Sequence, residues 1–174
     1  MEFKDIVQKR RSIRKFSEQE LTPEQTQTIL RAALMAPTSK STRAWHFIVV
    51  DNKDLLRQIS QSKSAGADFV AHAPLAVIVL MDIEKTDVWV EDAAIAAISM
   101  QYQATELGLG SCWAQIRLRG QSDGVMADEI LRDIMGYPNN YVAECIVAFG
   151  YPAIERKLQD EEKLKWETVS INKF

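Results

Sequence analysis

The stretch that decides the fold is Val88–Leu107, which reads VWVEDAAIAAISMQYQATEL. It is the longest candidate helix in the chain, and its central part, Ala93–Met100, has almost no polar face. A helix that is apolar on all sides must be buried. In a chain of 174 residues, a full-length buried helix needs cover from elsewhere, and a second subunit is the natural source. We therefore expect a homodimer.

Around this helix the sequence predicts further helices and four buried strands. The run Leu75–Leu80 is continuously apolar, which is typical of a central strand covered on both faces. The segments between consecutive strands are too long for the strands to form simple hairpins. We interpret residues 1–174 as one α+β domain, a sandwich in which helices surround a central mixed sheet. The other expected helices cover residues 2–10, the segment that starts at Thr22–Gln25, 55–60 and 128–135, and the other expected strands cover 45–50, 111–116 and 141–149.

Composition excludes several classes of function. The net charge of -3 argues against a nucleic-acid-binding protein. No apolar run of about 18 residues occurs, so no membrane span is expected. The charged start, Met1–Asp5, lacks the apolar core of a signal peptide, so we expect a cytoplasmic protein. Cys112 and Cys145 lack metal-like spacing, so we expect no metal and two buried free thiols.

A basic cluster is the first candidate site. Arg10, Arg11, Ser12 and Arg14 lie where a helix gives way to extended chain. Guanidinium groups bind phosphate through paired N–H donors, and a serine hydroxyl adds another donor. On spacing alone, a solvated basic helix terminus is the more common alternative. A nucleic-acid patch is a third interpretation, which the acidic remainder of the chain weakens.

Two further segments have the chemistry to bind a planar heterocycle. The loop Pro37–Arg43 is rich in hydroxyl groups, which suit the polar edge of a ring such as flavin. In Gly108–Trp113, two glycines let backbone come close to a ligand. The alternative interpretation of the first segment is an ordinary polar connecting loop, and that of the second is a helix C-cap followed by a tight turn. The second segment follows a helix and lacks a third glycine, so it is not a dinucleotide fingerprint.

Taken in this order, the segments resemble the nitroreductase family of flavoproteins. Each segment is weak alone, but four in the family's order and spacing are specific, and the likeness runs over nearly the whole chain. The resemblance favours the phosphate interpretation of the arginine cluster. The matching stretches are Arg10–Phe16, Ala36–Phe47, Leu107–Trp113 and Gly150–Ala153.

The resemblance implies two interlocked subunits, with FMN in each of two sites at their interface. The arginine cluster would contact the FMN phosphate and ribityl chain, and the hydroxyl-rich loop of the other subunit would line the flavin. The Gly-Leu-Gly segment would lie against the ring, and Lys163 of the tail would complete the phosphate site. The implied cofactor-binding residues are Arg10, Arg11, Ser12, Arg14, Pro37, Thr38, Ser39, Ser41, Arg43, Leu109, Gly110 and Lys163.

The activity that the resemblance implies is that of an NAD(P)H-dependent oxidoreductase. NADH or NADPH would pass hydride to the flavin N5 and leave, and a small electron-poor acceptor, a nitroaromatic or a quinone, would follow into the same pocket. This order predicts ping-pong kinetics. No catalytic side chain is needed, since the cofactor carries the chemistry. The alternatives are an FMN reservoir or redox sensor, an interaction protein without flavin, and a related flavoenzyme with different chemistry.

The loop departs from the family pattern, which commonly runs Pro-Ser-x-x-Asn-x-Gln-Pro-Trp. Here Ser41 stands at the asparagine position, Arg43 at the glutamine position and Ala44 at the second proline. An arginine near the flavin would favour an anionic reduced flavin or an anionic substrate. The chain also lacks room for the long insertion that covers the active site in larger members, so an open pocket is expected.

Overall fold

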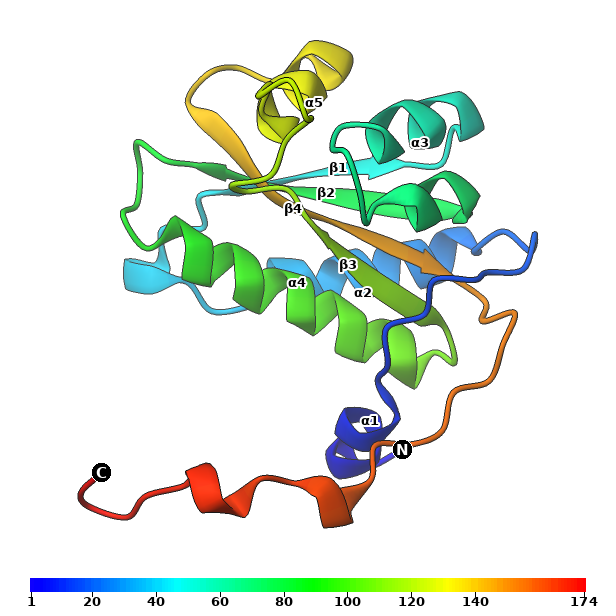
Figure 1. Ribbon diagram of the computed structural model, residues 1–174, viewed down its shortest axis with the longest axis vertical. Coiled ribbons are helices and arrows are strands. Elements are labelled where there is room, and N and C mark those ends of the chain that lie inside the picture. The colour runs from blue at the N-terminus through cyan, green and yellow to red at the C-terminus, as the bar shows by residue number, and fades with distance from the viewer.

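The computed structural model describes all residues, 1–174, and every predicted helix and strand is present in it (Figure 1). Most element ends lie within two residues of the predicted ones. Short 3-10 helices occupy Ser39–Ser41, Asp68–His72, Glu161–Lys163 and Trp166–Thr168. The five helices are α1 (Phe3–Lys9), α2 (Pro23–Leu34), α3 (Lys53–Ser60), α4 (Trp89–Glu106) and α5 (Ala127–Met135), and the four strands are β1 (Trp45–Val50), β2 (Leu75–Asp82), β3 (Gly110–Gln115) and β4 (Tyr141–Gly150).

The start of α2 illustrates how local sequence sets an element. The side chain of Thr22 accepts a hydrogen bond from the backbone N–H of Gln25 at 3.2 Å, and the backbone N–H of Thr22 donates to the Gln25 side chain at 3.0 Å. Together they form the predicted capping box, with Pro23 in the first turn.

The sheet has the order β1-β2-β4-β3, and every pair of neighbouring strands is antiparallel. The prediction of a mixed sheet is therefore wrong. The helix α4 connects β2 and β3, which run in the same direction as each other. These two strands are not neighbours, because the last strand, β4, lies between them and pairs with both. The parallel contact that remains is an isolated bridge between Ser12 and Ser111.

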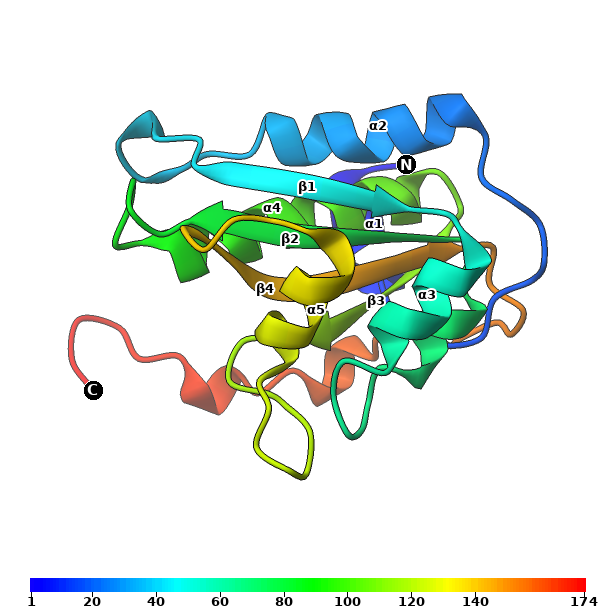
Figure 2. The ribbon, with the colours of Figure 1, turned by 90° about the horizontal axis from the view of Figure 1, so that it is seen from above.

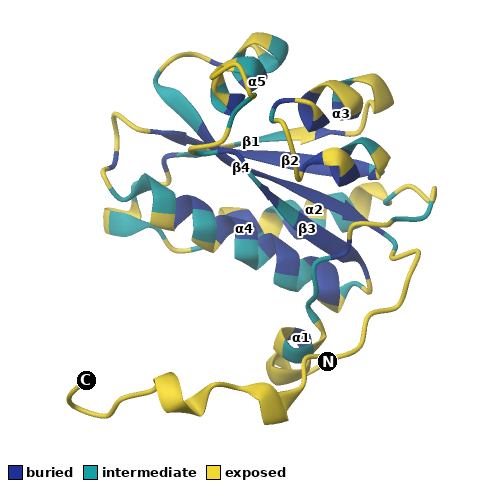
Figure 3. Ribbon diagram, in the orientation of Figure 1, coloured by how far each residue is buried: buried dark blue, intermediate teal, exposed yellow.

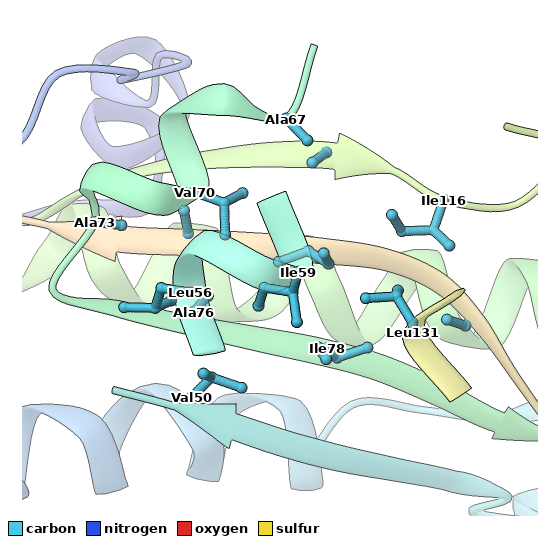
Figure 4. Close-up of a cluster of buried hydrophobic side chains, with 14 of the residues drawn as sticks. Val50, Leu56, Ile59, Ala67, Val70, Ala73, Ala76, Ile78, Ile116 and Leu131 are labelled. Atoms are coloured by element: carbon cyan, nitrogen blue, oxygen red, sulfur yellow. The ribbon is translucent and has the colours of Figure 1, made fainter. Parts of the chain in front are cut away.

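Helices cover both faces of the sheet (Figure 2). The side chains of β2 alternate between two cores. Ile78 and Leu80 face a core that α3 and α5 complete, whereas Val77 and Met81 face α2 and α4. Figure 4 shows part of the first core, where Leu56 and Ile59 of α3 pack over the sheet.

The helix α4 is buried on one side only (Figure 3). Ala93, Ala97 and Met100 are fully buried against the sheet, but Ile95 is 37% exposed. The expectation that the helix is buried on all sides thus does not hold within a single chain. One apolar side of α4 therefore remains exposed in the single chain. We expect a second subunit to cover this side, as the sequence predicted for the helix.

The two chain ends lie side by side before they separate. The backbone N–H of Ser17 donates to Tyr151 at 2.9 Å, that of Ala153 to Lys15 at 3.0 Å, and that of Gln159 to Gln8 at 3.0 Å. Residues 160–174 then continue as an exposed C-terminal arm that leaves the body of the protein (Figure 1). No helix has the combination of length and apolar character needed to cross a membrane.

Candidate active site

The extended segment that follows α1 runs along the start of β3. The backbone N–H of Ile13 donates to the carbonyl oxygen of Ser111 at 2.9 Å, next to the parallel bridge between Ser12 and Ser111. Side chains of an extended segment alternate between its two sides. The segment therefore divides the predicted basic cluster into two groups.

Arg10, Ser12 and Arg14 form the first group, and all three act on the thiol of Cys112. Burial raises the pKa of this thiol, while the positive charges of Arg14 and Arg10 and a hydrogen bond with Ser12 act in the opposite direction. The structure thus brings together three of the four predicted phosphate ligands. Cys112 is 1% exposed and is a free thiol, as the sequence predicted, and so is Cys145.

Arg11 lies on the other side of the segment. Its guanidinium donates to the carbonyl oxygen of Lys157 at 2.6 Å, which ties the C-terminal part of the chain to the body. Ile13 also points this way. A Cβ atom added to Gly110 would lie 2.8 Å from the Cβ atom of Ile13, so glycine at this position makes room for that side chain. Leu109 is 4% exposed.

Two hollows adjoin the segment. One, of about 180 Å³, is bordered by Ser12 and Arg14 together with Lys15 and Arg156. The other, of about 450 Å³, is bordered by Arg11, Leu109 and Gly110 between the end of α4 and the C-terminal part of the chain. None of Arg10, Arg14, Lys15 and Arg156 forms an ion pair. A cluster of cations without carboxylate partners is suited to bind an anion.

A third hollow, of about 600 Å³, lies further along β3. Lys63, which follows α3, lines it and donates from Nζ to the carbonyl oxygen of Gln115 at 2.8 Å. Burial lowers the pKa of Lys63, and repulsion by Arg119 lowers it further. The positive charge of Lys63 also lowers the pKa of Cys112, as do the charges of Arg14 and Arg10. Sequence analysis missed Lys63 and Arg156, because no motif marks either residue.

The hydroxyl-rich loop Pro37–Arg43 packs against the first turn of α4. The backbone N–H of Ser39 donates to the carboxylate of Asp92 at 2.9 Å, and the backbone N–H of Arg43 donates to the Thr38 hydroxyl at 3.1 Å. Asp92 is 2% exposed. Its carboxylate therefore binds the loop specifically, in addition to placing a negative charge near the start of the helix. The loop is thereby fixed, with Pro37, Ser41 and Arg43 exposed.

This loop lies far from the arginine cluster in the same chain (Figure 2). The loop precedes β1, whereas the cluster lies against β3, and these strands are the opposite edges of the sheet. Three strand spacings separate the edges by about 14 Å. The loop is also at the start of α4 and Gly110 just beyond its end, about 27 Å apart for a helix of 18 residues. A single chain therefore does not bring all predicted site residues together.

Lys163 belongs to the C-terminal arm. Its side chain is 82% exposed and pairs with Asp160 at 3.1 Å. Within one chain it has no contact with the arginine cluster. Chemically, the site combines an unpaired cationic cluster with adjoining hollows, which suits a phosphate-bearing ligand that carries its own reactive group.

The chain is similar to proteins of one family along most of its length. The model described as "Nitroreductase family" matches residues 7–71 and 59–151. A solved structure of an FMN-dependent nitroreductase from Clostridium difficile R20291 is 46% identical, with a TM-score of 0.96, over 98% of this chain and 99% of that chain. A relative from Methanothermobacter thermautotrophicus, whose name includes NAD(P)H nitroreductase, is 33% identical over 96% of this chain and 87% of its own length. A similarly named relative from Archaeoglobus fulgidus is 30% identical over 90% and 89%.

Proposed function

The chain belongs to the nitroreductase family, and from that premise we propose that it is an FMN-dependent oxidoreductase that uses NADH or NADPH. The observation that carries the proposal is the cluster of Arg10, Ser12 and Arg14, which lies against β3 without any carboxylate partner. The names of the relatives include FMN reductase (NADPH) from Bacillus subtilis, 28% identical over 86% of this chain.

The residues present fit the phosphate end of FMN. Two guanidinium groups and a hydroxyl act on the same thiol, Cys112, and donors of these kinds suit a phosphate dianion. The buried hydroxyl of Ser111 has no hydrogen-bond partner and lies beside Ser12. Arg156 borders the same hollow as Arg14 and adds a further cation. We assign the phosphate to this hollow.

When bound, the flavin would supply the chemistry of electron transfer between a nicotinamide and an acceptor. The chain's own residues bind and orient it. Leu109 and Gly110 line one hollow beside the arginine cluster, and Lys63 and Gln115 line the other. Lys163 would reach the phosphate from the C-terminal arm of a second copy.

The geometry supports a homodimer in which each site draws on both copies. One chain places its arginine cluster and its hydroxyl-rich loop at opposite edges of the sheet. The loop of a second copy would bring Pro37, Thr38, Ser39, Ser41 and Arg43 to the cluster. The open apolar side of α4 and the exposed apolar residues of the arm, such as Trp166, would be covered in the same assembly. The site is therefore incomplete without the second copy.

We infer a small electron-poor acceptor of the nitroaromatic or quinone class. The three hollows are open to solvent on the single chain, and no segment folds over them as a lid. One pocket that serves donor and acceptor in turn leads to ping-pong kinetics. Parallel initial-velocity lines at several fixed acceptor concentrations would support this order, and intersecting lines would contradict it.

An absorption spectrum of the purified protein tests the proposal first. We expect two visible flavin bands, which NADH or NADPH bleaches under argon and which a nitroaromatic acceptor restores. A protein that binds FMN but is not bleached by either nicotinamide would be an FMN reservoir or sensor. A colourless protein that does not take up added FMN would contradict the proposal, and the arginine cluster would then be an interaction surface.

A further inference from the structure

The hydroxyl-rich loop Pro37–Arg43 contains most of the strained backbone of the chain. Five residues other than glycine have a positive φ, and three of them lie in this loop: Lys40 at 50°, Ser41 at 53° and Arg43 at 48°. A residue with a Cβ atom meets a steric cost in this left-handed region, which glycine avoids, and the loop contains no glycine. Strained backbone persists only where the surrounding structure holds it, and it is concentrated at ligand sites.

Two contacts with the body of the protein enclose the strained residues. At the end of the loop, the carbonyl oxygen of Ala44 accepts a hydrogen bond from the backbone N–H of Asp82 on β2 at 2.8 Å. At its start, the backbone N–H of Ser39 donates to Oδ1 of Asp92 on α4 at 2.9 Å. The bond to Asp92 is the only hydrogen bond that residues 38–43 make with the rest of the chain. The conformation of the loop therefore depends on this one acceptor.

Asp92 is an unusual residue on which to base a purely structural contact. It is 2% exposed, and its second oxygen, Oδ2, has no hydrogen-bond partner. A buried carboxylate with a single neutral donor lowers the stability of the fold relative to a neutral residue at the same place. A buried polar group that is only half satisfied requires an explanation other than stability.

The helix dipole does not supply that explanation. An acid in the first turn of a helix is stabilised by the dipole, and α4 has two such acids, Glu91 and Asp92. Glu91 is exposed and accepts no hydrogen bond from the loop, whereas Asp92 is buried and does accept one. The burial of Asp92 and its bond with Ser39 thus point to the loop.

We propose that Asp92 is a positioning residue for the flavin, which holds the strained loop in the conformation that binds the ring in a second copy of the chain. The inference rests on the proposed function, which brings the loop of one copy to the arginine cluster of the other. Asp92 acts through Ser39 and the loop. Because the loop is held in place before the flavin arrives, binding does not have to order it.

The strain predicts which second change compensates for the loss of Asp92. Without the acceptor, the loop relaxes, and FMN binding has to restore the positive φ values. A glycine at Lys40, where φ is 50° and ψ is 22°, adopts this conformation without the steric cost. Lys40 is exposed and forms no ion pair, so the change Lys40→Gly removes no other contact of this kind. A residue that only stabilised α4 would leave a defect that glycine in the loop does not repair.

Fluorescence titration of the FMN-free protein with FMN tests the inference. Asp92→Ala should weaken FMN binding about tenfold, and the added change Lys40→Gly should recover about fivefold. Asn172→Gly, at a residue with a φ of 68° in the C-terminal arm, should give no recovery in the same background. Glu91→Ala removes the neighbouring acid of the same helix turn and should bind FMN as wild type does.

Hydrogen exchange of the FMN-free protein provides a readout without the cofactor. A peptide that covers residues 38–44 should exchange several-fold faster in Asp92→Ala than in wild type, and Lys40→Gly should slow it again. Asp92→Asn keeps a carbonyl oxygen as the acceptor, so it should bind FMN nearly as well as wild type, with no fall in Tm. This variant keeps the test valid if Asp92→Ala does not fold, which thermal unfolding establishes.

The outcomes separate the inference from the proposed function. Equal FMN affinity of Asp92→Ala and wild type, or a loss that Lys40→Gly does not reduce, would overturn the inference while wild type still binds FMN. Unchanged exchange of residues 38–44 in Asp92→Ala would also overturn it. A wild-type protein that takes up no FMN would contradict the proposed function and the flavin role of Asp92 together.

Discussion

The backbone N–H of Ile13 donates a hydrogen bond to the carbonyl oxygen of Ser111, with 2.9 Å between the two atoms. This bond fixes the register of the N-terminal segment on β3. With the segment in this register, the charges of Arg10 and Arg14 act on Cys112, while Arg11 donates a hydrogen bond to the C-terminal part of the chain. Two arginines that are adjacent in sequence thus have different surroundings, and the difference can be tested.

The double change of Arg10 and Arg14 to alanine should remove most of the FMN from the purified protein. Each arginine contributes a charged hydrogen bond to the phosphate, worth about 1.5–3 kcal/mol, so each loss should weaken FMN binding by about tenfold or more. Fluorescence titration of the apoprotein with FMN measures the effect. Arg57→Ala, which removes an exposed charge of α3, is the matched control. Full flavin occupancy in the double variant would refute the assignment of the phosphate site.

The change Arg11→Ala should loosen the C-terminal arm and leave most of the FMN in place. The side chain of Arg11 donates a hydrogen bond to the carbonyl oxygen of Lys157 at 2.6 Å, at the C-terminal part of the chain. Limited proteolysis should therefore cut the arm several-fold faster than in the wild type, because loss of a packed contact raises local opening. A loss of FMN as large as that of Arg10→Ala would instead place Arg11 in the phosphate site, as the family resemblance implies.

Local patterns predicted the elements of this fold better than their pairing. The capping box at Thr22 and the apolar run of β2 are local, and both are confirmed. The mixed sheet was wrong because β4 enters between β2 and β3, and strand order depends on contacts between residues far apart in the chain. The buried alanines of α4 were predicted, but only the structure shows which side of the helix stays open.

For the site, the sequence indicated which residue types are present, but not the direction in which each side chain points. Arg10, Ser12 and Arg14 do come together, but the alternation that separates Arg11 follows from the register on β3. Lys63 lies in a polar loop without any motif, so nothing local could have identified it. Asp92 did carry a signal, as one of two acids in the first turn of α4, but an acid there also suits the helix dipole, so the sequence did not predict its contact with the loop.

The change Asp128→Ala should destabilise the fold without direct effect on the proposed FMN site. Its carboxylate accepts hydrogen bonds from the Tyr137 hydroxyl at 2.8 Å, the Ala143 backbone N–H at 2.7 Å and Arg132 at 2.6 Å. Three hydrogen bonds would be lost, at a cost of about 3 kcal/mol, or a fall in Tm of about 10 °C. The Ala143 N–H would be left without its acceptor, whereas the Tyr137 hydroxyl keeps the carbonyl oxygen of residue 128 and Arg132 keeps that of Tyr141. Thermal unfolding measures it. Asp123→Ala, in an exposed loop, should change Tm by less than about 2 °C, and an equal fall in both variants would contradict the role of Asp128.

The change Ile95→Glu should separate the proposed dimer. Ile95 lies on the open side of α4 and is 37% exposed in the single chain, so a glutamate there is tolerated by the monomer fold. In an apolar interface the buried, unpaired carboxylate would be costly, and dimer affinity should fall by more than about tenfold. Light scattering after gel filtration reports the mass. Val125→Glu, at a similarly exposed apolar residue of a loop, is the control. Since the two halves of the site come from opposite edges of the sheet, the separated chains should also lose FMN, and a monomer that retains full flavin would show that one chain suffices.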